Sequence, residues 1–568
     1  MDFVLMFHSH LPYVLRHGRW PHGSDWLCEA AVDTYLPLVD GLRRLSDDGV
    51  PSPITLGITP VLANQLADAT FAAELQEFFG HRLEACASAP EALAAGGDGH
   101  LIPLVTFWRD RLSHLRDVFD STNGDLVAAF RGLQDAGRIE LVSSAATHGY
   151  LPLLGRDESI RLQLEVGFAE HARLFGAPPR GCWIPECAYR PAGPWISSGG
   201  GAGDARPGID DLLAESGFHY FFVDAHLAAA GAPLGAYADV PLGAERFDGE
   251  RHGGIGGHRR SGGSDAVVRS PYQAYHLAAP SQGRHPRAFV RDPRSSMQVW
   301  SRQHGYPGDG VYLEFHKIRW PGGLKLWRVT GPHADLGDKQ PYDVAAAFDR
   351  AAEHAAHFAG LLGRTAAEQQ GSVIVAPFDT ELFGHWWFEG VHFVTQLYRQ
   401  LAARTDVRAV TGSDHLRTSP GGRAIRLGEG SWGANGDHSM WLNPDTRWTW
   451  ERLWPLEQRF WDVVPLALRV DSLRPILAQA AREMLLAQSS DWQFIISTGV
   501  TADYGIERFE RHCSAAETLV ESLERDDDVG GRARAAEVAA TLAARDAVFP
   551  AVLDALARVL ERSNPPVR

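Results

Sequence analysis

The stretch Phe3–His10, which reads FVLMFHSH, joins five consecutive apolar residues to a polar end that contains two histidines. A continuous apolar run of this length is typical of a strand that is buried on both faces. Five further runs have the same form and are also followed by polar or ionisable residues: Ile54–Ile58, Ile139–Val142, Cys182–Ile184, Tyr220–Val223 and Val373–Ala376. Helical patterns lie between several of them, for example over 344–362 with Asp343 as the predicted N-terminal cap. This alternation predicts a parallel α/β fold, and the polar strand ends favour a β/α barrel with its site at the C-terminal mouth.

Three segments depart from the alternation. Ser197–Gly208 and Gly243–Ser264 are rich in glycine, and the second carries four arginines, so we expect a mobile surface loop there. From about Pro455 onward the sequence is rich in Ala, Leu and Arg with helical periodicity, and we expect residues 564–568 to fray. We therefore predict a barrel over residues 1–415 with an insertion at about 190–340, including a mobile loop at about 235–264. Residues 416–568 are predicted to form a helical C-terminal domain.

The composition excludes several classes of protein. The 568 residues are 45% hydrophobic and 22% charged, which is typical of a globular chain with a large core. A formal net charge of −16 argues against nucleic acid as a partner, because its phosphates would be repelled. The apolar runs are too short to span a membrane, and the first residues lack the basic start and cleavage site of a signal peptide. With five scattered cysteines and no CxxC pair, we expect reduced thiols and a cytoplasmic location.

Two carboxylates follow predicted strands in the same local context. Glu186 stands in WIPECAY and Asp379 in VAPFDTE, each shortly after a proline that cannot continue a sheet ladder. Two carboxylates at one barrel mouth are the minimum for glycosidic-bond chemistry, one as nucleophile and one as acid/base. The alternative is that each acid pairs with a nearby arginine. Because the proline-led context occurs twice, with aromatic residues both times, we favour the catalytic interpretation.

His8 and His10 lie two residues apart at a strand end, so both imidazoles can face the same side. The residues alone leave three roles open: metal ligation together with His148 or Asp379, hydrogen bonding to sugar hydroxyls, and structural hydrogen bonding. Three of the 17 tryptophans lie in loop-like contexts that suit stacking on a sugar ring: Trp26, Trp300 and Trp432.

Seven longer motifs cover most of the chain and make it resemble glycoside hydrolase family 57, most closely its 1,4-α-glucan branching enzymes. They are HSHLPYV at His8, SSAATHGYLPLLGRDE at Ser143, WIPECAYRPAG at Trp183, QVWSRQHGYPGD at Gln298, APFDTELFGHWWFEG at Ala376, GSWGANGDHS at Gly430 and SSDWQFIISTG at Ser489. The resemblance implies a distorted (β/α)7 barrel with an inserted subdomain and an all-helical C-terminal domain that closes the cleft. It also implies retaining chemistry on an α-1,4-glucan, without metal or cofactor.

The resemblance further implies roles for individual residues. Glu186 matches the family's nucleophile and Asp379 its acid/base. The expected substrate-binding residues are His8, His10, Trp26, His148, Arg291, Trp300, Gly308, Trp432, Asp491 and Gln493. Two departures stand out: Met440 occupies a position where the branching enzymes typically carry a second cleft tryptophan, and the loop that bears a tyrosine at their catalytic mouth offers only Tyr237 here.

The expected reaction is cleavage of an α-1,4-glucan and transfer of the released chain to a 6-hydroxyl, which creates an α-1,6 branch. Within the family, the alternatives are a 4-α-glucanotransferase and an α-amylase, which use the same residues with a different acceptor. From other classes, a metal-dependent polysaccharide deacetylase with His8, His10 and Asp379 around zinc, and a glucan-binding protein without activity, also fit the barrel and its aromatic residues. The sequence does not indicate an oligomeric state.

Overall fold

The computed structural model describes residues 1–195, 205–234, 269–278, 285–301, 305–331, 333–525 and 529–563. Within this part of the chain, seven parallel strands form the centre of the protein, in the spatial order β10-β1-β2-β3-β4-β7-β9. Their bounds are β1 Asp2–Ser9, β2 Ile54–Ile58, β3 Ile139–Ser144, β4 Gly181–Trp183, β7 Tyr220–Val223, β9 Arg287–Val290 and β10 Val373–Asp379. The six strands expected from the apolar runs are confirmed, and β1 and β2 are buried along their whole length.

The remaining strands are short and peripheral. They are β8 (Ala274–Leu277), antiparallel to β9, β12 (Ala424–Ile425) beside β8, β11 (Arg408–Ala409) beside β1, and the hairpin of β5 (Gly193–Pro194) and β6 (Ala205–Arg206). The two ends of the seven-strand order, β9 and β10, approach each other where Asp292 N donates to Val375 O at 2.8 Å. The sheet therefore curls into an incompletely closed barrel, which confirms the predicted distorted (β/α)7 fold class.

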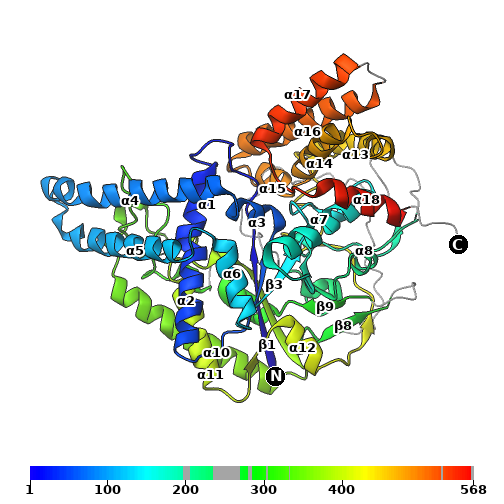
Figure 1. Ribbon diagram of the computed structural model, residues 1–568. Helices are drawn as coiled ribbons and strands as arrows, with labels where there is room; N and C mark the ends of the chain where they lie inside the picture. Colours follow the sequence, from blue (N-terminus) through cyan, green and yellow to red (C-terminus); the bar gives the residue numbers. More distant parts are fainter. Residues whose placement is uncertain are drawn as a thin grey trace.

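Helices cover the sheet and build the two appendages seen in Figure 1. Those of the barrel and its projection are α1 Ser24–Ala30, α2 Leu36–Asp47, α3 Pro60–Leu66, α4 Ala69–Ala95, α5 Ile102–Ser121, α6 Leu126–Asp135, α7 Asp157–Phe175, α8 Ile209–Glu215, α9 Pro293–Trp300, α10 Val344–Glu368, α11 Gly390–Ala402 and α12 Gly412–Thr418. The predicted cap of α10 is confirmed, because the Asp343 carboxylate accepts from Ala346 N.

One appendage is the pair α4 and α5, which extends away from the sheet in Figure 1. It packs on the segment 311–342: Trp108 Nε1 donates to Lys325 O at 2.6 Å, and Arg82 Nη1 donates to Gly322 O at 2.6 Å. The projecting unit thus combines residues before and within the insertion predicted at about 190–340. The predicted domain boundaries themselves stay predictions.

The other appendage is the C-terminal helical region, at the top of Figure 1. It comprises α13 Arg447–Ala467, α14 Arg474–Ala487, α15 Asp491–Thr498, α16 Ala502–Glu524, α17 Val529–Arg545 and α18 Val552–Ser563. Pro455 lies inside α13, so the helical region begins before the residue at which composition placed its start. No helix in the described ranges combines the length and apolar character needed to cross a membrane. The glycine-rich loop at 235–264, its Tyr237 and the tail 564–568 lie outside the described residues.

Candidate active site

The C-terminal ends of β1, β2, β3, β4 and β10 bring the predicted polar residues together. In the β1–β10 ladder His8 is paired with Asp379, so the predicted acid/base lies beside the first histidine. The His10 imidazole Nδ1 lies 3.0 Å from the hydroxyl of Thr59, which directly follows β2. Ser9 Oγ donates to Thr380 Oγ1 at 2.7 Å and joins β1 to the turn after β10. The strand ends therefore bring these predicted polar residues together, and their catalytic or binding roles stay predictions.

Glu186 occupies a short 3-10 turn, Pro185–Cys187, immediately after β4. Its φ is +60°, in the left-handed region that non-glycine residues seldom adopt and that concentrates at functional sites. The carboxylate is buried, at 9% exposure, yet it is partnered: Trp432 Nε1 donates to Oε2 at 2.6 Å, and His148 Nδ1 lies 3.7 Å from Oε1. The turn therefore presents one oxygen to a fixed donor and holds the carboxylate in a defined orientation.

Burial raises the pKa of Glu186 to about 8, and the Trp432 hydrogen bond acts in the opposite direction. The negative charges of Asp379 and Asp491 add to the rise, which shows that the two predicted catalytic carboxylates lie within electrostatic range of each other. A neighbouring negative charge makes ionisation of a buried carboxyl less favourable, so the protonation state of Glu186 depends on the charge carried by Asp379. The arrangement suits general acid and nucleophilic catalysis at one carbon.

Trp432→Phe is expected to lower kcat/KM at pH 7 by roughly ten- to a hundredfold, because a hydrogen bond to a charged group contributes roughly 1.5–3 kcal/mol. Since the indole N–H stabilises ionised Glu186, its loss raises the pKa of this carboxyl, and the acidic limb of the pH profile of kcat/KM moves to higher pH. The deficit should therefore shrink as the pH rises. A deficit of the same size at every pH would contradict this role.

Trp432 is only 1% exposed, which is less than an open stacking platform requires. Its ring packs edge-on against Trp183 at 4.9 Å, and the Arg291 guanidinium lies 5.4 Å from its centre. Trp300, which is half-buried, lies 6.4 Å away in a perpendicular orientation. In this arrangement the indole N–H of Trp432 donates a hydrogen bond to Glu186, while stacking of its ring on substrate stays a prediction.

A backbone pairing fixes Trp432 in this position. Tyr189 N donates to Gly430 O at 2.8 Å, Gly430 N donates to Tyr189 O at 3.0 Å, and Trp432 N donates to Glu186 O at 3.0 Å. Gly430 has a φ of +151°, and a Cβ there would lie 2.2 Å from Gly436 O, so a side chain does not fit. The GSWG motif is thus held by backbone hydrogen bonds alongside the Glu186 turn.

The three predicted histidines lie together as a stack. His8 and His148 have ring centroids 4.8 Å apart, His10 and His148 4.2 Å, and His8 also stacks on Trp183 at 4.9 Å. Burial lowers the pKa of His8 and of His148 well below the usual value, so both are neutral near pH 7. Stacked neutral rings place their nitrogens side by side, where they can donate to and accept from sugar hydroxyls.

The C-terminal helical region contributes directly to this stack. Asp491, the first residue of α15, accepts a hydrogen bond from His10 Nε2 at 2.9 Å, and Ser490 Oγ lies 3.0 Å from His148 Nδ1. Burial opposes ionisation of Asp491, but the adjacent His10 outweighs it and lowers the pKa of the carboxyl. Asp491 thus lies beside two of the predicted histidines, while its contact with substrate stays a prediction. Gln493, two residues further along α15, is buried and donates to Thr449 Oγ1 at 3.1 Å.

Two of the proposed binding residues lie apart from these contacts. Trp26, on α1, is half-buried with His22 as its ring neighbour at 6.3 Å. Gly308 is the exposed last residue of a 3-10 turn, Tyr306–Gly308, whose Tyr306 is buried. Substrate contact at both positions stays a prediction.

Two residues that the sequence reasoning did not single out contribute to the site. Glu381 accepts from His10 N at 3.2 Å and from the Tyr35 hydroxyl, and burial raises its pKa to about 8. Trp441 is fully buried and stacks on Tyr150 at 4.4 Å. The neighbouring Met440, at the position where a cleft tryptophan was expected, is only 1% exposed and does not line an open cleft. The adjacent aromatic ring is that of Trp441.

Comparison with known proteins gives a consistent result over nearly the whole chain. The sequence model described as glycosyl hydrolase family 57 matches residues 4–427, and the model described as the 1,4-alpha-glucan branching enzyme C-terminal region matches residues 455–555. The chain is 38% identical to the 1,4-alpha-glucan branching enzyme TK1436 of Thermococcus kodakarensis over 93% of this chain and 74% of that one. It is 31% identical to the probable branching enzyme Rv3031 of Mycobacterium tuberculosis over 92% of each.

Solved structures show the same similarity. The crystal structure of TK1436, bound to glucose and additives, superposes with a TM-score of 0.85 at 36% identity, covering 98% of this chain and 96% of that one. The branching enzyme of Pyrococcus horikoshii gives a TM-score of 0.82 at 36% identity and the same coverage. The α-amylase AmyC of Thermotoga maritima gives 0.76 at 26% identity, covering 98% of this chain and 99% of that one.

Proposed function

The chain belongs to glycosyl hydrolase family 57, and we propose that it is a 1,4-α-glucan branching enzyme with Glu186 as nucleophile and Asp379 as acid/base. The family and the branching function expected from the sequence are confirmed by the similarity to branching enzymes over both the barrel and the helical region. The observation that carries the residue assignment is the Glu186 carboxylate, buried in a left-handed turn at the strand ends and within electrostatic range of Asp379.

The reaction begins when a Glu186 oxygen attacks the anomeric carbon of an α-1,4-linked glucose. The glycosidic C–O bond breaks, and Asp379 gives its proton to the departing 4-oxygen. This leaves a glycosyl ester on Glu186 and a carboxylate at Asp379. A 6-hydroxyl of an acceptor glucan then gives its proton to Asp379 and attacks the same carbon, which releases Glu186 and forms an α-1,6 bond with retained configuration.

The acceptor decides the product. A 6-hydroxyl gives a branch, a 4-hydroxyl gives disproportionation and water gives hydrolysis. Because Glu186 and Trp432 are both nearly excluded from solvent, the ester would form where few water molecules can reach it. This favours transfer over hydrolysis. The substrate is an α-glucan, and we infer an amylose-like or glycogen-like donor from the branching chemistry.

Incubation with amylose should increase the number of α-1,6 linkages, read from their anomeric proton signal, faster than the number of reducing ends. Debranching the product should then release chains shorter than the starting amylose. Glu186→Gln provides the matched inactive control. Reducing ends without new branches would favour an α-amylase, the second candidate suggested by the similarity to AmyC. Activity lost with EDTA and restored by zinc would instead favour the metal-dependent deacetylase chemistry.

A further inference from the structure

The chain leaves the histidine stack through the segment Pro12–His17, which runs between α3 and the C-terminal helices. On the barrel side, the fully buried Gln65 of α3 holds this segment by its backbone. Its Oε1 accepts from Val14 N at 2.7 Å, and its Nε2 donates to Pro12 O at 3.0 Å. The segment that follows His10 is therefore fixed to the barrel by an amide that satisfies the main chain in both directions.

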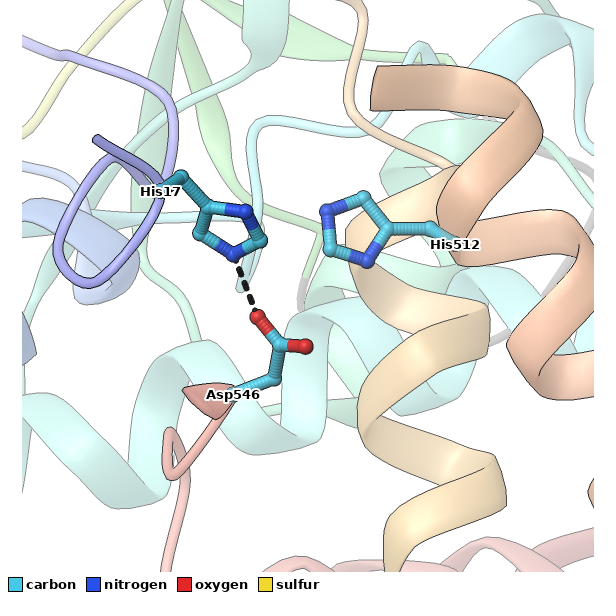
Figure 2. Close-up of side chains that lie close together, drawn as sticks. All are labelled: His17, His512 and Asp546. Atoms are coloured by element: carbon cyan, nitrogen blue, oxygen red, sulfur yellow. Dashed lines mark hydrogen bonds and ion pairs between the residues drawn. The ribbon is translucent and has the colours of Figure 1, made fainter. Parts of the chain in front are cut away.

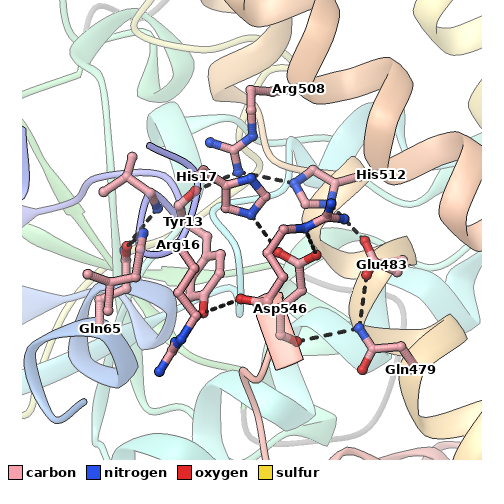
Figure 3. Close-up of polar contacts among 12 residues, drawn as sticks. Tyr13, Arg16, His17, Gln65, Gln479, Glu483, Arg508, His512 and Asp546 are labelled. Atoms are coloured by element: carbon pink, nitrogen blue, oxygen red, sulfur yellow. Dashed lines mark hydrogen bonds and ion pairs between the residues drawn. The ribbon is translucent and has the colours of Figure 1, made fainter. Parts of the chain in front are cut away.

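On the other side, Arg508 of α16 is hydrogen-bonded to the same segment and is 2% exposed. Figure 3 shows its guanidinium between the segment and the C-terminal helices. Nη2 donates to Tyr13 O at 2.6 Å and to His512 Nε2 at 3.1 Å, and Nη1 donates to the Tyr504 hydroxyl at 2.8 Å. Lysine has a single ammonium group on a flexible stem and does not reproduce such a fork.

Arg508 also contacts α15, the helix that reaches the active site. Its guanidinium lies 5.0 Å from the centre of the Trp492 ring. Trp492 follows Asp491, whose carboxylate accepts from His10 Nε2. One buried cation thus touches both sides of the His10–Asp491 hydrogen bond: the backbone just after His10 and the residue just after Asp491.

We propose that Arg508 is a positioning residue that fixes α15 on the segment after His10 and so sets Asp491 against His10 in the reacting complex. The inference rests on the proposed function, because it assigns Arg508 to the efficiency of glycosyl transfer. Arg508 itself touches neither of the predicted catalytic carboxylates.

Arg508 and three further buried residues, His17, His512 and Asp546, together form a hydrogen-bonded clamp on the segment Pro12–His17. Figure 2 shows His17, His512 and Asp546 converging from the segment, from α16 and from the residue after α17. His17 Nε2 donates to Asp546 Oδ1 at 2.6 Å, and all three side chains are fully shielded from solvent. His512 Nδ1 donates to Glu483 Oε2 at 2.8 Å, while its Nε2 accepts from Arg508. Both ring nitrogens of His512 therefore have partners.

The same three residues have the composition of a metal site, yet their surroundings favour the hydrogen-bonded clamp. Arg508 occupies the lone pair of His512, and Arg545 Nε donates to Asp546 Oδ2 at 2.8 Å. Burial and the nearby Asp546 raise the pKa of Glu483 well above its usual value, so two guanidinium groups face a single carboxylate. A divalent cation would enter a cluster that is already positive.

A double-mutant cycle on Arg508→Met and Asp491→Asn tests the proposal. Fluoride release from α-maltosyl fluoride reports formation of the glycosyl-enzyme whatever the acceptor, so the cycle can be read even if the branching assignment fails. We expect each single variant to lose about tenfold in kcat and the double variant to lose about tenfold as well, because both act on one contact. A loss near one hundredfold in the double variant would mean independent effects and overturn the proposal.

Matched variants separate positioning from folding. Arg511→Met changes an arginine on the same helix whose ion pair is with Glu507 of that helix, and it should keep the parent kcat and branch-to-hydrolysis ratio. Arg508→Lys should keep the helical circular dichroism spectrum but lower that ratio. If Arg508→Met does not fold, the cycle is run with Arg508→Lys, and additive losses there overturn the proposal equally. One equivalent of zinc in the parent protein that is lost in His17→Leu would also overturn it, in favour of a metal site.

Discussion

Glu186→Gln is expected to lower kcat for amylose by roughly 10⁴-fold or more while leaving glucan binding nearly unchanged. The amide keeps the shape of the carboxylate and can still accept from Trp432 Nε1, which lies 2.6 Å from Oε2 in the parent protein. It cannot form the glycosyl ester, so the loss falls on the chemical step. Initial rates of branch formation and of reducing-end release, together with calorimetric binding of maltoheptaose, measure both parts.

Glu186→Ala sharpens this prediction. Removal of the carboxylate leaves space at the left-handed turn, and added azide should attack the anomeric carbon from the face that Glu186 uses. With an activated α-glucosyl donor, azide should restore turnover and yield a β-glycosyl azide, inverted relative to the donor. An α-linked azide, or a residual rate within tenfold of the parent, would assign the nucleophile to another residue.

Activity should also depend on pH in a way that follows from burial. The Glu186 carboxyl must be ionised to attack, and its pKa is raised to about 8. The acidic limb of kcat/KM, which reports the free enzyme, therefore lies near pH 8 and not near pH 4–5. A bound glucan displaces water from the pocket and so changes the pKa of Glu186 in the enzyme–substrate complex. That pKa is measured from the pH profile of kcat.

The strands could be predicted because burial on both faces leaves a direct trace in the sequence. In a run such as Phe3–Phe7 every residue is apolar, and the structure buries all five residues. The polar residue after each run then locates the site, since parallel strands end at one edge. Strand β9 was not predicted: its apolar residues are Ala288–Val290, and the adjacent β8 has only intermediate burial at His276 and Leu277.

Contacts between distant segments left no such trace. The orientation of Trp432 depends on its backbone pairing with Glu186, 246 residues earlier in the chain, so the sequence context suggested a loop tryptophan with an open face. The clamp joins His17 to Asp546 across 529 residues, and neither lies in a motif with recognisable spacing. Glu381 was quoted within the Asp379 motif, but its bond to His10 N appears only once β1 and β10 are paired.

The geometry also changes what Trp432 is expected to do. Because its N–H is committed to Glu186 and its ring is packed by Trp183, removal of the indole should first impair formation of the intermediate. An effect on the choice between acceptor chain and water then comes second.

Asp379→Asn separates the two catalytic roles and carries the second large effect. Asparagine cannot protonate the departing 4-oxygen, so kcat on amylose should fall by roughly 10³-fold or more, within the range that general acid catalysis contributes. Fluoride leaves without a proton, so α-maltosyl fluoride should still form the ester on Glu186 at close to the parent rate. The second step lacks its base, and the ester should accumulate.

Mass spectrometry should then find one added maltosyl group on the peptide that contains Glu186. Azide, which needs no deprotonation, should release this group as an α-glycosyl azide. The adduct depends on Glu186, so Glu186→Gln combined with Asp379→Asn is the control that should carry none. An adduct on a different peptide, or equal losses on amylose and on the fluoride, would remove Asp379 from the acid/base role, because an acid catalyst matters only where the leaving group needs its proton.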